Sequence, residues 1–190
     1  MSTTTRAATR AATRAATGRA ARADGESLEE WLDSYHMTLA RARVAWVRRV
    51  GTPVSVLGPV SVDRRGRHIF RAAFSGYQGA DFTGHTSCGR HIVLEAKHHG
   101  GDGSWDCGIS PDGRAAEGGA LDDRQWSELV RAHGQGCLVM VILRAWGSCW
   151  ALDVEAISGH VRRVQRRTIQ PGEIATIGRR LRGVEWWPAS

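Results

Sequence analysis

The chain has 190 residues and a formal net charge of +7 at pH 7. This length is typical of one domain that buries its own core. Hydrophobic residues make up 42% of the chain, but no apolar run approaches the 18 residues of a membrane-spanning helix. The four cysteines form no CxxC pair, and the reducing cytosol is the default for such usage. We therefore expect a cytoplasmic protein without a membrane partner.

Residues 1–23 form a basic tail whose composition differs from the rest of the chain. They contain five arginines and no acid, which leaves a net charge of only +2 for residues 24–190. Arg6, Arg10 and Arg14 recur every four residues, so a helix would stack them in one stripe. A disordered tail is the simpler expectation, because no large apolar residue is available to bury, and an organellar transit peptide has the same composition.

The first helix is predicted to begin at Ser27, which forms a capping-box pattern with Glu30. Its apolar residues fall on one helical face. They are Leu28, Trp31, Leu32, Tyr35 and Leu39.

Strands are expected over residues 44–57 and 69–74, with a basic excursion between Gly58 and Arg71. A solvated hairpin tip explains this composition, but four arginines within eight residues on a protruding ribbon are also what contact with DNA phosphates requires. These candidate DNA-binding residues are Arg64, Arg65, Arg67 and Arg71. A second basic cluster has no role assigned beyond a solvated face; it consists of Arg162, Arg163, Arg166 and Arg167.

Residues 81–97 are predicted to form an antiparallel hairpin with a turn at Gly84. Side chains alternate along a strand, so Glu95 and Lys97 share one face. The apolar run before Glu95 is typical of a strand covered on both faces, where a charge needs a partner or a metal. The hairpin would also bring Asp81 to the same end as Glu95.

Two carboxylates and a main-chain carbonyl make a hard oxygen site that suits Mg²⁺ or Mn²⁺. Asp81 and Glu95 are the candidate metal ligands, and Lys97 would orient or help deprotonate an attacking water. A solvated Glu/Lys pair on an amphipathic edge strand explains the same residues, and a bare D…ExK match arises by chance in many proteins. A zinc site is a weaker alternative without regular ligand spacing, built from Cys88, His91, His98, His99 and Cys107.

A second helix is predicted after the Gly-rich stretch of residues 98–120. Asp122 or Asp123 would cap it and Gly134 would end it. Its inward residues are expected to be Trp126, Leu129 and Val130.

Further strands are expected over residues 137–143 and 149–154. The second helix connects the Glu95 strand to the strand at residues 137–143 as a crossover, so these two strands should be parallel. We therefore predict an α/β fold with a mixed β-sheet flanked by helices.

The order of these motifs resembles that of the RecU family of Holliday junction resolvases, a branch of the PD-(D/E)XK nuclease superfamily. The resemblance runs from about Gly25 to the C-terminus. GESLEEWL (25–32) looks like the family's opening helix, and GTPV (51–54) looks like its PTPV strand. DFTG (81–84) looks like its DYNG motif, and GRHIVLEAK (89–97) looks like its GRYIDFEAK motif. DRQ (123–125) stands near the position of its HDHQ motif. The chain departs from the family pattern within two of these motifs. Val93 replaces the family's second-strand aspartate, a residue that is taken to point away from the site. The histidines of HDHQ are absent.

The resemblance implies a restriction-endonuclease-like nuclease domain over residues 24–190, with a basic β stalk at about 58–71 that enters the junction. It implies catalysis by the D…ExK residues with Mg²⁺, with Glu29 supporting the metal or its water and Gln125 as a supporting polar group. Two symmetric cuts in branched DNA call for a homodimer, and a recombinase is a further candidate partner. The implied source is bacterial or phage.

Two alternatives remain at the level of function. One is a nuclease of the same fold that acts on other branched DNA or on duplex DNA. The other is a recombination accessory protein that binds junctions without cutting them. A complete Asp/Glu/Lys set favours a nuclease, because a pure binder would be free to lose it.

Overall fold

The structure is a computed structural model that describes residues 28–51, 54–56, 61–62, 64, 68–69, 72–74 and 79–182. Several sequence predictions lie outside these residues: the tail over residues 1–23, the helix cap at Ser27, and the side chains of Arg65, Arg67 and Arg71.

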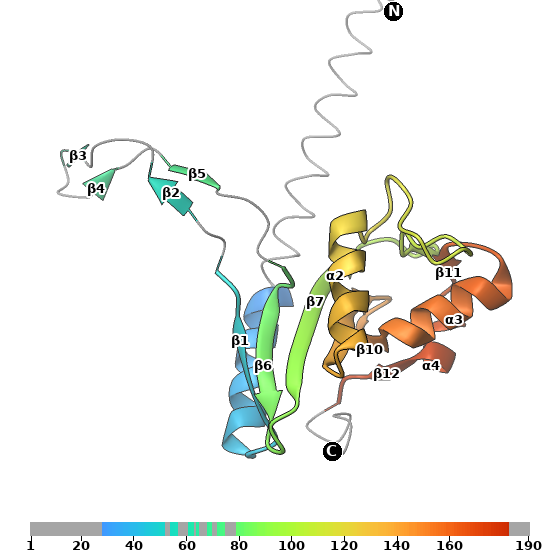
Figure 1. Ribbon diagram of the computed structural model, residues 1–190, viewed down its shortest axis with the longest axis horizontal. Coiled ribbons are helices and arrows are strands. Elements are labelled where there is room, and N and C mark those ends of the chain that lie inside the picture. The colour runs from blue at the N-terminus through green and yellow to red at the C-terminus, as the bar shows by residue number, and fades with distance from the viewer. Residues whose placement is uncertain are drawn as a thin grey trace, which may run out of the picture.

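A six-stranded sheet with the order β1-β6-β7-β9-β10-β12 forms the centre of the molecule (Figure 1). Its strands are β1 (Ala45–Arg49), β6 (Phe82–Thr86), β7 (His91–His99), β9 (Leu138–Ala145), β10 (Ser148–Asp153) and β12 (Gly178–Arg180). β7 and β9 are parallel, and the other neighbouring strands are antiparallel. The predicted α/β class, the mixed sheet and the crossover are therefore confirmed.

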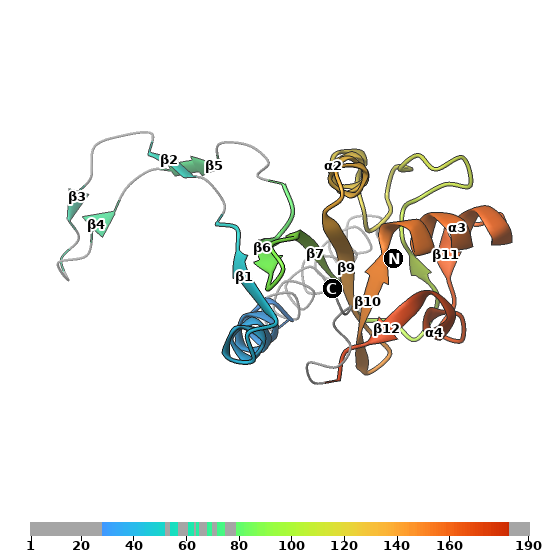
Figure 2. The same ribbon diagram turned by 60° about the horizontal axis from the view of Figure 1, so that its bottom comes forward.

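Helices cover both faces of this sheet, as Figure 2 shows. The N-terminal helix is described over residues 28–41 and packs against one face. The helices α2 (Asp123–Gly134) and α3 (Val154–Val164) pack against the other, and α4 (Ile174–Ile177) contributes Ile174 to the same cluster. Each face thus has its own apolar core, and β7 and β9 contribute residues to both.

Two short antiparallel pairs stand away from the six-stranded sheet (Figure 1). They are β2 (Val54–Val56) with β5 (Ala72–Phe74), and β3 (Ser61–Val62) with β4 (His68–Ile69). The chain between β1 and β6 therefore leaves the sheet as a two-stranded ribbon, and Arg64 is an exposed turn residue on it. The predicted strand over residues 44–57 is in fact two strands that belong to different sheets.

The Gly-rich stretch after β7 belongs to the core. β8 (Trp105–Asp106) pairs with β11 (Thr168–Ile169), and Cys107, Ile109 and Leu121 are buried. At Gly108 the backbone has φ of +84° and passes so close to the main chain of Leu121 that a side chain would collide with it.

Two further local predictions were wrong. Gly84 lies inside β6, and the turn of the hairpin follows at residues 87–90. Val130 is 45% exposed rather than inward, and Trp31, on the predicted apolar face of the first helix, is 39% exposed. Consecutive residues of a helix are about 100° apart around its axis. A buried face centred near Leu32 therefore leaves the preceding residue, Trp31, at its edge, and a face centred near Leu129 leaves the following residue, Val130, at its edge. The helix α3 was not predicted. Among the described residues, no helix is long and apolar enough to cross a membrane.

A substitution at Gly84 tests how closely the backbones of β1 and β6 approach each other. It faces Val47 across the strand pair, and a Cβ atom there would collide with the backbone of Trp46. We expect Gly84→Ala to lower the free energy of unfolding by about 1–3 kcal/mol. Gly51→Ala is the control, because no described atom lies within 4 Å of its added Cβ. Urea denaturation followed by circular dichroism measures both, and equal stabilities would contradict the close approach.

Candidate active site

The candidate site lies where β6 begins beside the middle of β7. Asp81 directly precedes β6, and its position is fixed from both sides. Its carbonyl oxygen accepts a 2.7 Å hydrogen bond from the Val50 amide, and its Oδ2 accepts a 2.8 Å hydrogen bond from the Ala96 amide. The hairpin register pairs Phe82 with Leu94, so Asp81 lies across from Glu95, and the two residues are at the same end of the hairpin as predicted.

Glu95 is the most unusual residue of the site, because its carboxylate is buried in the middle of the sheet with only 1% of the residue exposed. One oxygen, Oε1, lies 2.8 Å from Lys97 Nζ and also accepts a hydrogen bond from Gln125 Nε2. The other, Oε2, has no hydrogen-bond partner among the described residues. A buried carboxylate oxygen without a partner is costly, so this atom would gain from a bound cation.

The pKa of Glu95 is raised from 4.5 to about 7, chiefly because burial disfavours the charged carboxylate. The Lys97 ammonium opposes this rise, whereas the nearby Asp81 carboxylate adds to it. When both carboxylates are ionised, Lys97 neutralises only one of them. The site therefore retains an uncompensated negative charge that favours a proton or a metal ion.

Gln125 joins the site to the start of α2. Asp122 caps this helix, and its carboxylate accepts a 2.8 Å hydrogen bond from the Gln125 amide. The Gln125 side-chain oxygen accepts hydrogen bonds from the Asp122 amide (3.3 Å) and from Lys97 Nζ (3.0 Å). Gln125 thus holds Lys97 and Glu95 together while it completes a capping box. The sequence contained this signal as an Asp-x-x-Gln pattern, but the double role was not predicted.

The other predicted site residues are placed differently. Glu29 lies on the N-terminal helix and forms an ion pair with Arg49 of β1, its one polar partner among the described residues. The structure does not join it to Asp81 or Glu95. Val93 shares the face of Glu95 and packs into the α2 core. This departure from the family pattern therefore puts an apolar side chain beside the site, not on the opposite face as expected.

A pocket of about 290 Å³ opens next to Asp81, between the hairpin and α2. Val50 and Phe82 line it on the strand side, and Glu128 and Arg131 line it from α2. Sequence patterns alone did not mark these two helical residues, because their proximity to the hairpin depends on how α2 packs over the sheet.

The described residues contain no group of three or more His, Cys, Asp or Glu side chains placed to hold a metal ion. The predicted zinc set is therefore not assembled among them. Two carboxylates still fit Mg²⁺, which usually binds one or two carboxylates and fills its remaining positions with water and phosphate. Asp81 and Glu95 offer this donor set.

Comparison with known proteins adds no assignment: no family model matches the chain, and no curated protein sequence matches it at a significant level.

The raised pKa of Glu95 predicts a pH-dependent stability in metal-free buffer. The folded state favours the protonated carboxyl, so wild-type stability should fall as the pH rises from about 4.5 to about 7. Glu95→Gln removes this loss, because glutamine does not ionise. The free energy of unfolding of the variant minus that of wild type should therefore rise by about 1–3 kcal/mol as the pH increases over the same interval. Chemical denaturation at pH 5 and pH 8 measures the change. Glu30→Gln controls for removal of an exposed carboxylate, and a pH-independent difference for Glu95→Gln would contradict the prediction.

Proposed function

We propose that the protein is a metal-dependent DNA endonuclease. Its substrate is a four-way DNA junction, which it resolves by paired symmetric nicks in the manner of the RecU-type enzymes that the sequence resembles. The observation that carries the proposal is the buried Glu95 carboxylate: Lys97 and Gln125 hold one of its oxygens, and the other has no hydrogen-bond partner among the described residues.

Asp81 and Glu95 would hold Mg²⁺, or Mn²⁺ in its place. The metal would neutralise charge on the scissile phosphate and stabilise the leaving 3′ oxygen. The support is the donor chemistry of the pair and the uncompensated charge described above. The Ala96 amide already orients the Asp81 carboxylate through Oδ2, which leaves Oδ1 for the metal.

Lys97 is proposed to position the attacking water and to assist its deprotonation. Its ammonium is held between Glu95 Oε1 and Gln125 Oε1, at 2.8 and 3.0 Å. Only 16% of the Lys97 side chain is exposed, so the charge is partly desolvated and acts on a nearby oxygen more strongly than it would in water. Gln125 is a positioning residue in this scheme, because it acts through Lys97 and Glu95.

The proposal extends to a restriction-endonuclease-like fold, a homodimer and a basic stalk. Support for the stalk comes from the ribbon that leaves the sheet between β1 and β6 and from the exposed Arg64 on it. The homodimer follows from the substrate, because two symmetric nicks require two identical sites. Glu29 is retained as a candidate metal-supporting acid on the strength of the resemblance alone, and a recombinase remains a candidate partner.

The decisive experiment incubates the full chain with a mobile four-way junction and with matched duplex, in Mg²⁺ and in EDTA. Symmetric nicks that need Mg²⁺ and occur only in the junction are expected. Asp81→Asn, Glu95→Gln and Lys97→Ala should each reduce nicking by about a hundredfold or more, with junction binding retained because the basic surface is untouched. Glu30→Gln should cut like wild type.

Other outcomes of this experiment separate the alternatives. Equal cutting of duplex would indicate a nuclease with another target. Binding without cutting in Mg²⁺ and in Mn²⁺ would indicate an accessory protein. Near-normal nicking by Asp81→Asn would refute the metal site, and recovery of Lys97→Ala by added Mg²⁺ alone would argue against a direct role for the lysine.

The stalk is tested by Arg64→Ala/Arg65→Ala. Each phosphate that the variant no longer neutralises should reduce the slope of log affinity against log salt by about 0.9 on B-form DNA. Arg162→Ala/Arg163→Ala is the matched control, since it also removes two adjacent arginines, both exposed on α3. Fluorescence anisotropy at several salt concentrations measures both slopes. If the two variants weakened junction binding equally, net charge would explain the effect and the stalk would have no special role.

A further inference from the structure

The face of the sheet that carries the candidate active site continues across β1 and β6. On this side α2 packs against β9, whereas no described helix lies over β1 and β6 (Figure 2). Ala45 and Val47 pack in the core that the N-terminal helix covers. Alternation along β1 therefore turns Trp46 and Arg48 to the side of α2, where both are exposed.

The strand register arranges the side chains of this face in three rows across β1, β6 and β7. Directly opposite residues of antiparallel strands share a face, and neighbouring rows are two residues, or about 7 Å, apart along a strand. In order toward the active site, the rows are Trp46, His85 and His91; Arg48, Thr83 and Val93; and Val50, Asp81 and Glu95. The aromatic row and the candidate metal ligands are therefore on one surface, with an arginine between them.

Trp46 is a large aromatic side chain at the far end of this surface. The imidazole of His85 stacks against its indole, with ring centroids 5.4 Å apart and planes 21° apart. Trp46 nonetheless remains 42% exposed, and His85 and His91 are exposed as well. Exposed aromatic rings on a sheet surface are what several single-strand-binding modules use to stack unpaired bases.

Two arginines give this surface a charge that suits a DNA backbone. Arg48 lies in the middle row, and Arg131 lines the pocket of about 290 Å³ beside Asp81. Both arginines are exposed, and neither forms an ion pair with any described residue. Glu128 is the one acidic residue of the pocket lining, and its carboxylate lies beside Gly79. The two outer rows contain no acid, and guanidinium geometry matches phosphate.

We propose that this face binds the DNA strand that is cut, with an unpaired base stacked on Trp46 and a backbone phosphate held by Arg48. The base must be unpaired, because both faces of a base inside a duplex are already covered by its neighbours. We rest this inference on the proposed function, because it takes DNA as the substrate of the same site.

The spacing of the rows sets the distance between the unpaired base and the cut. Trp46 and Asp81 lie two rows apart, which is about 14 Å, or about four base steps of B-form DNA. The site would therefore select DNA that is open within about four nucleotides of the scissile phosphate, and this requirement favours a branch point over a closed duplex.

The binding test uses the full chain in EDTA, with a labelled single-stranded oligodeoxyadenylate and with a duplex of the same length. Trp46→Ala should weaken single-strand binding by about five- to a hundredfold and duplex binding much less, and Trp46→Phe should retain much of the affinity. Arg48→Gln should also weaken single-strand binding and reduce the salt slope by about 0.7 for each phosphate that is no longer neutralised. Fluorescence anisotropy at several salt concentrations measures these effects.

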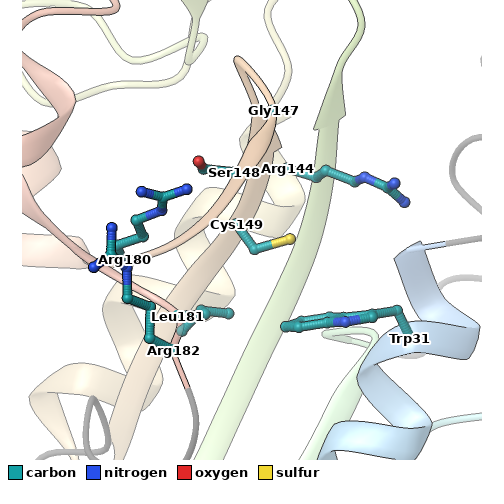
Figure 3. Close-up of a pocket in the computed structure, with 8 residues that line it drawn as sticks. All are labelled: Trp31, Arg144, Gly147, Ser148, Cys149, Arg180, Leu181 and Arg182. Carbon is teal, nitrogen blue, oxygen red and sulfur yellow. The ribbon is translucent and has the colours of Figure 1, made fainter.

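Matched controls lie outside this face. Trp31 is 39% exposed and stacks on Tyr35, but it belongs to the N-terminal helix, which packs against the opposite face. Figure 3 shows it at a separate pocket with Arg144 and Cys149. Trp31→Ala should therefore bind both DNA forms like wild type. Arg162→Gln is the control for Arg48→Gln, because it removes an exposed arginine from α3.

Several outcomes would overturn the proposal. Trp46→Ala, folded by circular dichroism, might bind single strands like wild type, Trp31→Ala or Arg162→Gln could be as harmful as its counterpart, or Trp46→Ala could weaken duplex and single-strand binding equally. Conversion of a dimer into a monomer by Trp46→Ala, measured by sedimentation, would show instead that a second copy covers this face. Asp81→Asn should bind single strands like wild type. A wild-type protein that binds as expected but does not nick in Mg²⁺ would refute the nuclease and support the binding face.

Discussion

The burial of one carboxylate, that of Glu95, is the constraint on which much of this structure depends. A charge in the middle of a sheet costs several kcal/mol unless partners compensate for it. Lys97 supplies the opposite charge from two residues along the same strand, and Gln125 supplies a hydrogen bond from a helix 30 residues further along the chain. The parallel pairing of β7 and β9 makes this second contact possible, because it requires a crossover and α2 is that crossover.

The sheet also separates two kinds of chemistry. Alternation along β7 sends Glu95 and Lys97 to the face covered by α2 and their neighbours Leu94 and Ala96 to the face covered by the N-terminal helix. The first face gathers carboxylates and a lysine, which suit a metal and a water. The second carries Arg144 and the indole of Trp31 at its margin.

Features set by local rules could be predicted from the sequence, and those set by long-range packing could not. The hairpin that brings Asp81 and Glu95 to one end, the cap of α2 and the parallel pair followed from alternation, capping and the handed crossover, although the turn of the hairpin was put at the wrong residue. The exposure of Trp31, the ion pair of Glu29 and the buried Gly-rich segment depend on neighbours distant in sequence. The proximity of Gln125 to Lys97 was expected only from a family resemblance, and its geometry agrees with that expectation.

The three simultaneous duties of Gln125 restrict how this protein can change through evolution. Its amide must accept from the Asp122 backbone and from Lys97 while it donates to Glu95. Glutamate would preserve the helix cap but would lose the donor and bring another negative charge to a buried carboxylate, whereas asparagine would be one methylene too short for the same reach. A lineage that replaces this glutamine would therefore need a second substitution at position 95 or 97, so these positions should vary together rather than one at a time.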